Sequence, residues 1–153
     1  MWKLIRPDAY RVWNDSIVRE RLWRYYEVFN NRLNAKFLIA LKVGADVELE
    51  AESGKLWSVH DRTSGVFRGI LKRVDKDELK LENMDLPKIS YLDLKVELAR
   101  RILSECHFCE RRCGANRLEG KKGFCKLGRE SYVSTAFLHT GEEAPLVPSG
   151  TNA

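Results

Sequence analysis

The sequence predicts an α+β protein. A small mixed α/β front portion with two main helices would precede an irregular, metal-organised four-cysteine loop and an extended tail. Apolar residues recur at helical spacing near 15–30 and 91–104, short apolar or alternating runs fill 36–82, and every cysteine lies within 106–125. The expected boundaries are a mixed α/β front extension at 1–89, a helix with the metal-binding cysteine segment at 90–137, and the tail at 138–153.

The first predicted helix begins at Asp15 and Ser16, residue types that favour helix starts. From there, apolar positions recur at steps of four, three and four residues and share one helical face: Val18, Leu22, Tyr25 and Phe29. This amphipathic pattern occurs in membrane-surface helices, but it is commoner in helices that face a protein core. We therefore interpret the segment as structural.

Short apolar runs predict strands in the middle of the chain. The run KFLIALKV at 36–43 is typical of a buried strand that ends at Gly44, and the alternation at 45–51 predicts a half-buried strand with an acidic outer face. The sequence Thr-Ser-Gly at 63–65 predicts a turn between further short elements. Strand and helix both stay open as interpretations of 55–84.

The second helix has the clearest start signal. Ser90 followed three residues later by Asp93 is typical of a capping box, and the helix is expected to end near Ser104. Its apolar positions share one predicted face: Leu92, Val96, Ala99 and Leu103. The helix leads directly into Cys106 and would fix the position of this first cysteine.

Composition limits the compartment and the class of protein. The chain has 153 residues, 44% of them hydrophobic, which is enough for a core that does not depend on disulfides. No apolar run approaches the length of a signal peptide or of a membrane span, so we expect a cytoplasmic protein without a membrane partner. In a reducing compartment, clustered cysteines bind metal more often than they form disulfides, the alternative being two disulfides in a secreted domain.

The cysteines are spaced C-x2-C-x3-C-x11-C, and the candidate metal ligands are Cys106, Cys109, Cys113 and Cys125. Four thiolates within this short segment can close around one zinc ion or one [4Fe–4S] cluster, and the spacing fits either. Gly114 would let the chain turn away after the third cysteine. His107 and His139 are candidate substitute ligands, although four cysteines leave them an ordinary hydrogen-bonding role.

The formal net charge of +5 is concentrated around these cysteines, where Lys95 to Arg129 contain ten Lys or Arg against four Glu. The bias fits either a nucleic-acid surface or charges that offset a tetrathiolate centre. We favour the second interpretation because the segment has few aromatics on which bases could stack. Only Phe108 and Phe124 are present, and both adjoin a cysteine, so we expect them to pack over the metal site.

His60 and Asp61 could in principle act together in acid–base chemistry. On a strand, however, neighbouring side chains point to opposite faces, and no nucleophile lies at a supporting spacing. We interpret the two residues as an exposed pair beside a turn.

The run CHFCERRCGANRLEGKKGFCKLG at 106–128, followed by STAFLHTGEEAPLVPSGT at 134–151, resembles a known family. It is similar to the region just upstream of the barrel in radical S-adenosylmethionine proteins related to pyruvate formate-lyase activating enzyme. The matching features are the four cysteine positions, the Arg111-Arg112-Cys113-Gly114 turn, Gly120 to Cys125, and the HxGEE-like His139 to Glu143. Residues 1–89 resemble the front extension of archaeal members.

The resemblance implies an accessory four-cysteine region of an enzyme that cleaves S-adenosylmethionine to a 5′-deoxyadenosyl radical. The family's catalytic C-x3-C-x2-C motif is absent from these 153 residues, where the order is C-x2-C-x3-C, so no catalytic residue carries over. We expect the chain alone not to be catalytic. S-adenosylmethionine would bind only in a full-length or partnered form, with the barrel supplied by missing C-terminal sequence or by a separate chain.

The resemblance also covers His139, Glu142 and Glu143, which would form a turn that docks on the barrel or would line its site. The alternative function is a free-standing basic zinc module that binds nucleic acid or a protein partner.

Overall fold

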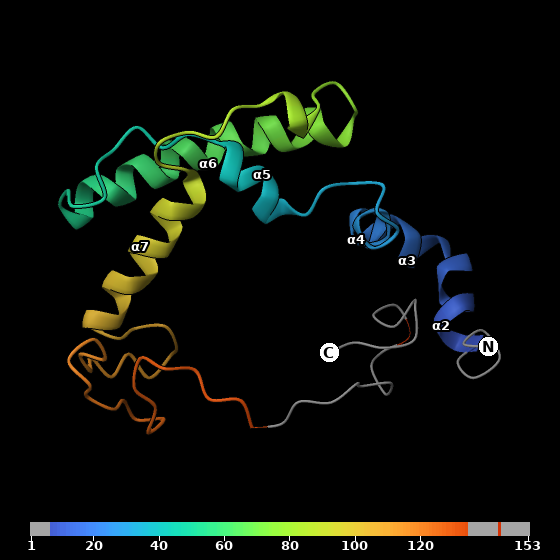
Figure 1. Ribbon diagram of the computed structural model, residues 1–153. Coiled ribbons are helices and arrows are strands. Elements are labelled where there is room, and N and C mark those ends of the chain that lie inside the picture. The colour runs from blue at the N-terminus through green and yellow to red at the C-terminus, as the bar shows by residue number, and fades with distance from the viewer. Residues whose placement is uncertain (1–6, 135–143, 145–153) are drawn as a thin grey trace. The chain divides into compact units, whose positions relative to one another are not determined.

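The computed structural model describes residues 7–134 and 144, and this part of the chain is helical (Figure 1). No strand occurs among these residues, and their β-type pairing is limited to an isolated bridge between Gly44 and Ser90. The predicted α+β fold class is therefore wrong. The stretch 36–82, in which strands were expected, forms helices and irregular connections instead.

The chain divides into two compact units, the first of which is described by residues 7–33, 132–134 and 144. Its elements are the helices α2 (Pro7–Arg11), α3 (Ser16–Arg21) and α4 (Trp23–Phe29) and the 3-10 helix η1 (Val12–Asn14). The Asp15 carboxylate caps α3 by accepting from the backbone N–H groups of Ile17 and Val18 at 2.8 and 3.1 Å. The predicted start is confirmed, but the expected single helix is broken at Leu22.

An aromatic cluster packs the first unit. Trp13 is buried, and its ring lies 4.7 Å from that of Tyr26 and 6.3 Å from that of Tyr25, measured between centroids. The Arg19 side chain donates to the Trp13 carbonyl at 3.1 Å and so links α3 to η1. These contacts support the structural interpretation of this amphipathic segment.

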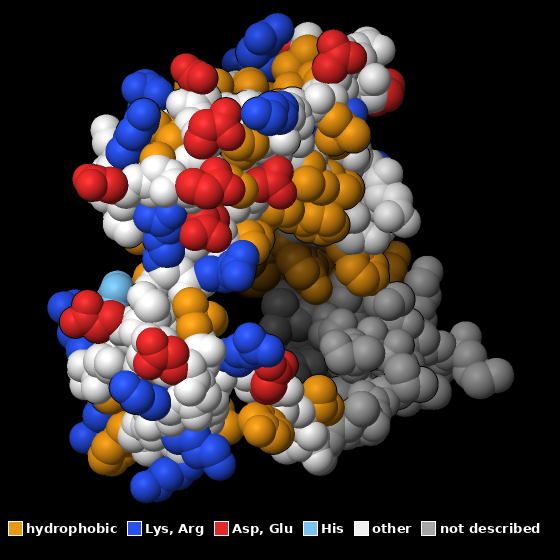
Figure 2. Space-filling view, turned by 60° about the vertical axis from the view of Figure 1, so that its left-hand side comes forward, with side chains coloured by type: hydrophobic (Ala, Val, Ile, Leu, Met, Phe, Trp, Pro, Cys, Tyr) orange, Lys and Arg blue, Asp and Glu red, His pale blue; other side chains and the backbone are white. Residues whose placement is uncertain are grey.

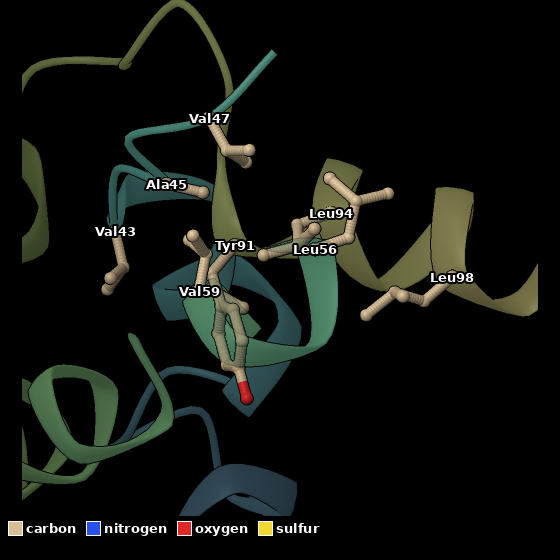
Figure 3. Packing of buried hydrophobic residues seen from close by; sticks show 9 residues of the cluster. Val43, Ala45, Val47, Leu56, Val59, Tyr91, Leu94 and Leu98 are labelled. Atoms are coloured by element: carbon tan, nitrogen blue, oxygen red, sulfur yellow. The ribbon is translucent and has the colours of Figure 1, made fainter. Parts of the chain in front are cut away.

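The second unit comprises residues 34–131 and contains the cysteines. Its elements are α5 (Lys36–Lys42), α6 (Ser53–Asp75), the 3-10 helix η2 (Leu81–Asn83) and α7 (Tyr91–Ser104). The core lies where α5, α6 and α7 meet, and Figure 3 shows Leu56 of α6 beside Leu94 of α7. Its buried residues are Ala40, Val43, Ala45, Val47, Leu56, Val59, Tyr91, Leu94 and Leu98.

Helix α6 runs through the turn predicted at 63–65. Its core-facing side chains recur at steps of three or four residues: Leu56, Val59, Thr63, Phe67, Ile70 and Val74. Each of the helical glycines Gly65 and Gly69 costs about 1 kcal/mol relative to alanine. Burial of a continuous apolar stripe exceeds that cost, because each fully buried aliphatic side chain contributes roughly 1.5–3 kcal/mol.

The predicted strands at 36–43 and 45–51 are also absent. Residues 36–42 form α5, in which Ile39 and Ala40 are buried. After α5 the chain is irregular, and two backbone hydrogen bonds hold it against the start of α7. The Tyr91 N–H donates to the Val43 carbonyl at 2.7 Å, and the Ala45 N–H donates to the Ile89 carbonyl at 2.9 Å. The acidic stretch after Gly44 therefore passes beside the start of α7 without forming a sheet.

The capping box at the start of α7 is confirmed. The Ser90 hydroxyl accepts from the Asp93 N–H at 3.1 Å, and the Asp93 carboxylate accepts from the Ser90 N–H at 2.8 Å. The predicted apolar face is only partly the one that packs: Leu92 lies against the core, but α7 buries Tyr91, Leu94 and Leu98, whereas Val96 is 54% exposed. Both sets have helical spacing, so spacing alone did not distinguish the two faces.

The second half of α7 is fixed by Arg101. Its guanidinium donates to the Leu49 carbonyl at 2.7 Å and to the Ser53 hydroxyl at 3.1 Å, and it pairs with Glu97 at 2.9 Å. The long Arg101 side chain thus ties the last turn of α7, which leads into the cysteine segment, to the residues at the start of α6.

Candidate metal centre

The cysteine segment folds back onto the end of α7. The Arg117 N–H donates to the Leu103 carbonyl at 2.8 Å, in the last turn of the helix. Cys106 is joined to the following turn by two backbone hydrogen bonds: its N–H donates to the Ala115 carbonyl at 3.2 Å, and its carbonyl accepts from Gly114 at 3.0 Å. Cys106 is therefore held firmly, and it is 3% exposed.

The turn from Cys109 to Gly114 reverses the chain. The Arg112 N–H donates to the Cys109 carbonyl at 3.0 Å, which closes a tight turn. Arg112 and Gly114 have positive φ values of 39° and 64°, and the value at Gly114 confirms the expected role of this glycine. The turn brings the third cysteine back toward the first.

Two of the cysteines lie in surroundings that favour the thiolate. The backbone N–H groups of Ala115 and Phe124 donate to the Cys113 sulfur and, with a smaller effect of the positive charge on Arg117, lower the pKa of that thiol. The neighbouring Cys106 side chain lowers this pKa further, with the smallest effect. The Arg117 guanidinium and then the Leu127 N–H lower the pKa of Cys125 in the same way. Thiolates are the form in which cysteine binds metals.

Arg117 lies at the middle of this group. Its side chain donates to the Cys125 sulfur at 3.2 Å and to the Gly128 carbonyl at 3.3 Å, and it also donates to the Leu127 carbonyl. The Cys125 side chain and, with a smaller effect, the nearby Cys106 side chain raise the pKa of Arg117. Arg117 thus holds the last cysteine and lies near the first.

Gly123 leaves room for the Arg117 guanidinium and the Cys113 sulfur beside it. A Cβ atom added to Gly123 would lie 2.3 Å from Arg117 Nη2 and 3.0 Å from the Cys113 sulfur. An alanine at this position would therefore require the end of the Arg117 side chain to shift. The constraint comes from space and not from backbone conformation, since Gly123 has no positive φ.

Cys109 does not share these contacts. It is exposed, and no described residue is recorded in hydrogen-bond contact with its sulfur. Within residues 7–134 and 144, no group of three or more His, Cys, Asp or Glu side chains is gathered closely enough to hold a metal ion. Cys125 is held by the Arg117 side chain, whereas the sulfur of Cys109 makes no hydrogen bond to a described residue.

The donor set nevertheless fits a thiolate-bound metal. Two sulfurs receive backbone N–H hydrogen bonds and a buried cation lies beside them, features that stabilise sulfur as an anion. His107 Nδ1 lies 2.8 Å from the Glu105 carbonyl, in agreement with an ordinary hydrogen-bonding role. His139, Glu142 and Glu143 fall outside the described residues.

His60 does not behave as an exposed residue beside a turn. It lies within α6 with 19% of its side chain exposed, and its Nε2 atom is 3.1 Å from both the Tyr91 hydroxyl and the Lys95 amine. Its Nδ1 atom faces Asp61, also at 3.1 Å. The interpretation as an exposed turn pair was wrong, and the contacts connect α6 to α7.

The two phenylalanines of the cysteine segment do not pack over its sulfurs as expected. Phe108 is 56% exposed and Phe124 is 64% exposed, and the Arg111 guanidinium lies over the Phe124 ring at 4.3 Å. Figure 2 shows basic, acidic and hydrophobic side chains interspersed over the visible face of the region that follows α7. Aromatic surface is therefore available to a partner.

Sequence reasoning missed Arg117 and the spatial requirement at Gly123. Arg117 was counted among ten basic residues, and only its position between the third and fourth cysteines distinguishes it in the sequence.

None of the described helices is long and apolar enough to cross a membrane.

Comparison with known proteins gives one informative match. Over 131 residues, which are 86% of this chain, the sequence is 43% identical to the uncharacterized protein MJ0674 of Methanocaldococcus jannaschii. The match covers 36% of that protein, so the chain spans about a third of the length of this relative. No family model matches the chain. No solved structure matches it.

Proposed function

We propose that this chain is the metal-binding accessory region of a larger protein related to radical S-adenosylmethionine enzymes of the pyruvate formate-lyase activating type. Cys106, Cys109, Cys113 and Cys125 would hold one zinc ion or one [4Fe–4S] cluster. The observation that carries the proposal is a guanidinium, that of Arg117, buried against cysteine sulfurs. A buried cation needs a negative counter-charge, and thiolates of a metal centre supply it.

The chain's own residues would prepare the sulfurs for metal. Helix α7 and the hydrogen bonds at Cys106 fix the first ligand, while backbone N–H groups stabilise the thiolates of Cys113 and Cys125. Closure would require the four sulfurs, that of the exposed Cys109 among them, to come closer together than they lie here. Zinc would supply a structural cross-link at this site, whereas a cluster would supply one-electron transfer.

The proposed link to a larger enzyme rests on the sequence resemblance and on length. The relative from M. jannaschii is a longer protein of which the matched segment is 36%, as expected for an accessory region that occurs beside another domain. In this proposal the radical-generating centre and S-adenosylmethionine belong to sequence beyond these 153 residues or to a separate chain, and no catalytic residue lies here.

A second candidate function is a free-standing basic zinc module that binds nucleic acid or a protein. The observation in its favour is the exposure of Phe108 and Phe124 among basic residues. Single-stranded nucleic acid is bound by stacking bases on aromatic rings within a positively charged surface. Binding that weakens steeply as salt concentration rises would favour this function. Salt-independent binding of a separate barrel chain would favour the accessory role.

Metal and acid-labile sulfide content, with the absorption spectrum of protein purified without oxygen, test the metal proposal. We expect either one zinc per chain and no visible absorption, or about four irons with four sulfides and a broad visible band. Cys113→Ser should lower the metal content, whereas Ser104→Ala, which changes an exposed residue outside the cysteine set, should not. Wild-type protein that contains neither metal, and takes up neither when reconstituted, would contradict the proposal.

A further inference from the structure

Among the described residues, no carboxylate partners the buried cation of Arg117. Arg117 is 7% exposed, although arginine is almost never buried unless it is paired. Within the described part of the chain, the side chain that its guanidinium contacts is that of Cys125, and no Asp or Glu lies within ion-pair distance. The surrounding acidic residues pair elsewhere: Glu119 with Lys121, and Glu130 with Arg129.

The orientation of Arg117 is fixed from both ends. Its backbone N–H is bound to the Leu103 carbonyl of α7, and its backbone carbonyl accepts from Gly120 at 3.1 Å. The Leu127 and Gly128 carbonyls accept from Nη1, which leaves Nη2 directed at the Cys125 sulfur. A guanidinium held this rigidly is a permanent positive charge and not a mobile surface side chain.

We propose that Arg117 is the built-in counter-ion of the cysteine centre: it keeps its hydrogen bond to Cys125 when metal binds and offsets the excess negative charge of four thiolates. This inference rests on the proposed metal-binding function. Four thiolates around a divalent ion leave two excess negative charges, and a fixed cation beside them stabilises that state over one with fewer thiolate ligands. Arg117 is therefore a positioning residue and not a ligand.

The competing role for Arg117 is that of a placeholder. In that case the guanidinium occupies the position that metal takes, and metal binding must displace it at a cost. The two roles predict opposite effects of removing the charge. A counter-ion makes metal binding tighter, so its loss weakens binding, whereas loss of a placeholder leaves metal binding unchanged or strengthens it.

Titration of the reduced, metal-free chain with Co²⁺ separates these outcomes, because cobalt bound by thiolates gives intense charge-transfer and ligand-field bands. We expect Arg117→Gln to retain the four-thiolate spectrum but to bind Co²⁺ roughly 10- to 100-fold more weakly. Arg117→Lys, which keeps the charge, should recover part of that loss. Arg129→Gln is the matched control, because it removes the same charge from an exposed pair with Glu130 and should match wild type.

Each outcome bears on a different claim. If wild type gives no thiolate–cobalt bands, the zinc form of the proposed function fails, and the counter-ion role beside a divalent ion fails with it. If wild type binds Co²⁺ and Arg117→Gln binds it equally well or more tightly, the counter-ion role is wrong and the metal site stands. Equal weakening in Arg117→Lys and Arg117→Gln would also overturn the charge argument. Helical circular dichroism of the metal-free variants, which reports mainly on α6 and α7, checks that neither change unfolds the unit.

Discussion

The backbone N–H of Arg117 donates to the carbonyl of Leu103 at 2.8 Å and ties the cysteine loop to the last turn of α7. The same residue reaches the Cys125 sulfur with its side chain at 3.2 Å. One residue therefore connects the helix that precedes the first cysteine with the segment that contains the last. Every prediction for the site depends on this connection or on the helix packing behind it.

Gly123→Ala should weaken metal binding without loss of helix. The added methyl group would lie 2.3 Å from Arg117 Nη2 and 3.0 Å from the Cys113 sulfur, so the guanidinium or the loop must shift. We expect Co²⁺ affinity to fall roughly 10-fold or more. Gly128→Ala is the control, because its added Cβ meets nothing within 4 Å. Equal affinities of the two variants would show that the close contact at Gly123 is not needed.

Leu94→Ala should destabilise the second unit far more than Val96→Ala. Leu94 lies on the face of α7 that packs in the core and is fully buried, whereas Val96 lies on the opposite side of α7 and is 54% exposed. Removing the buried side chain costs roughly 2–5 kcal/mol, and the exposed substitution should change the free energy of unfolding by about 0.5 kcal/mol or less. Urea unfolding followed by circular dichroism measures both. A larger loss of unfolding free energy in Val96→Ala than in Leu94→Ala would show that the face predicted from the sequence is the buried one.

Stability should fall in acid partly through Asp93. Hydrogen bonds from the Ser90 hydroxyl and then the Ser90 N–H lower the pKa of Asp93 from that of an ordinary aspartate. The folded state therefore binds this proton less readily than the unfolded state. The stabilisation is complete above the aspartate pKa of the unfolded chain, about 3.9, and is lost as pH falls through the lower folded-state pKa.

Urea unfolding of the metal-free chain across this pH range measures that contribution without interference from metal release. Wild type should be more stable than Asp93→Asn at neutral pH, and the difference should shrink as pH falls below that of ordinary aspartate titration. Asp85→Asn changes an exposed loop carboxylate and should give a smaller difference. A gap between wild type and Asp93→Asn that stays constant down to acid pH would argue against the capping contribution.

Local start signals in the sequence predicted the helix boundaries better than apolar runs predicted the type of element. Asp15 and Ser90 act as caps through short-range hydrogen bonds to backbone N–H groups, so a few neighbouring residues determine them. The run at 36–43 is short and apolar, and in such a run periodicity does not separate a buried strand from a buried helix. Leucine, alanine and lysine in that run favour helix.

Helix α6 was obscured by turn-forming residues in its middle. Thr63 and Gly65 suggested a break, yet apolar positions on both sides share a single helical stripe from Leu56 to Val74. The stripe from Leu56 to Val74 is apparent in the sequence only when a segment much longer than a short strand is considered. Tertiary burial along the whole helix outweighs the local cost of glycine.

The cysteine spacing predicted the candidate ligands, but it did not indicate what surrounds them. The role of Arg117 depends on how the loop folds back to Leu103, and the requirement at Gly123 depends on a contact between residues six positions apart. Neither follows from composition, because the other basic residues nearby are also Arg and Lys. The structure was needed to distinguish one buried guanidinium from a generally basic surface.

The reactivity of Cys109 tests the four-cysteine closure most directly, because this cysteine is exposed and its sulfur makes no hydrogen bond to a described residue. The measurement is the rate of alkylation of each cysteine, followed by mass spectrometry, in metal-loaded protein and after chelation. We predict that bound metal slows the alkylation of Cys109 together with that of Cys106, Cys113 and Cys125. After chelation, Cys109 should be alkylated rapidly. If Cys109 reacts equally fast with and without metal while the others are protected, the centre does not contain four cysteine ligands.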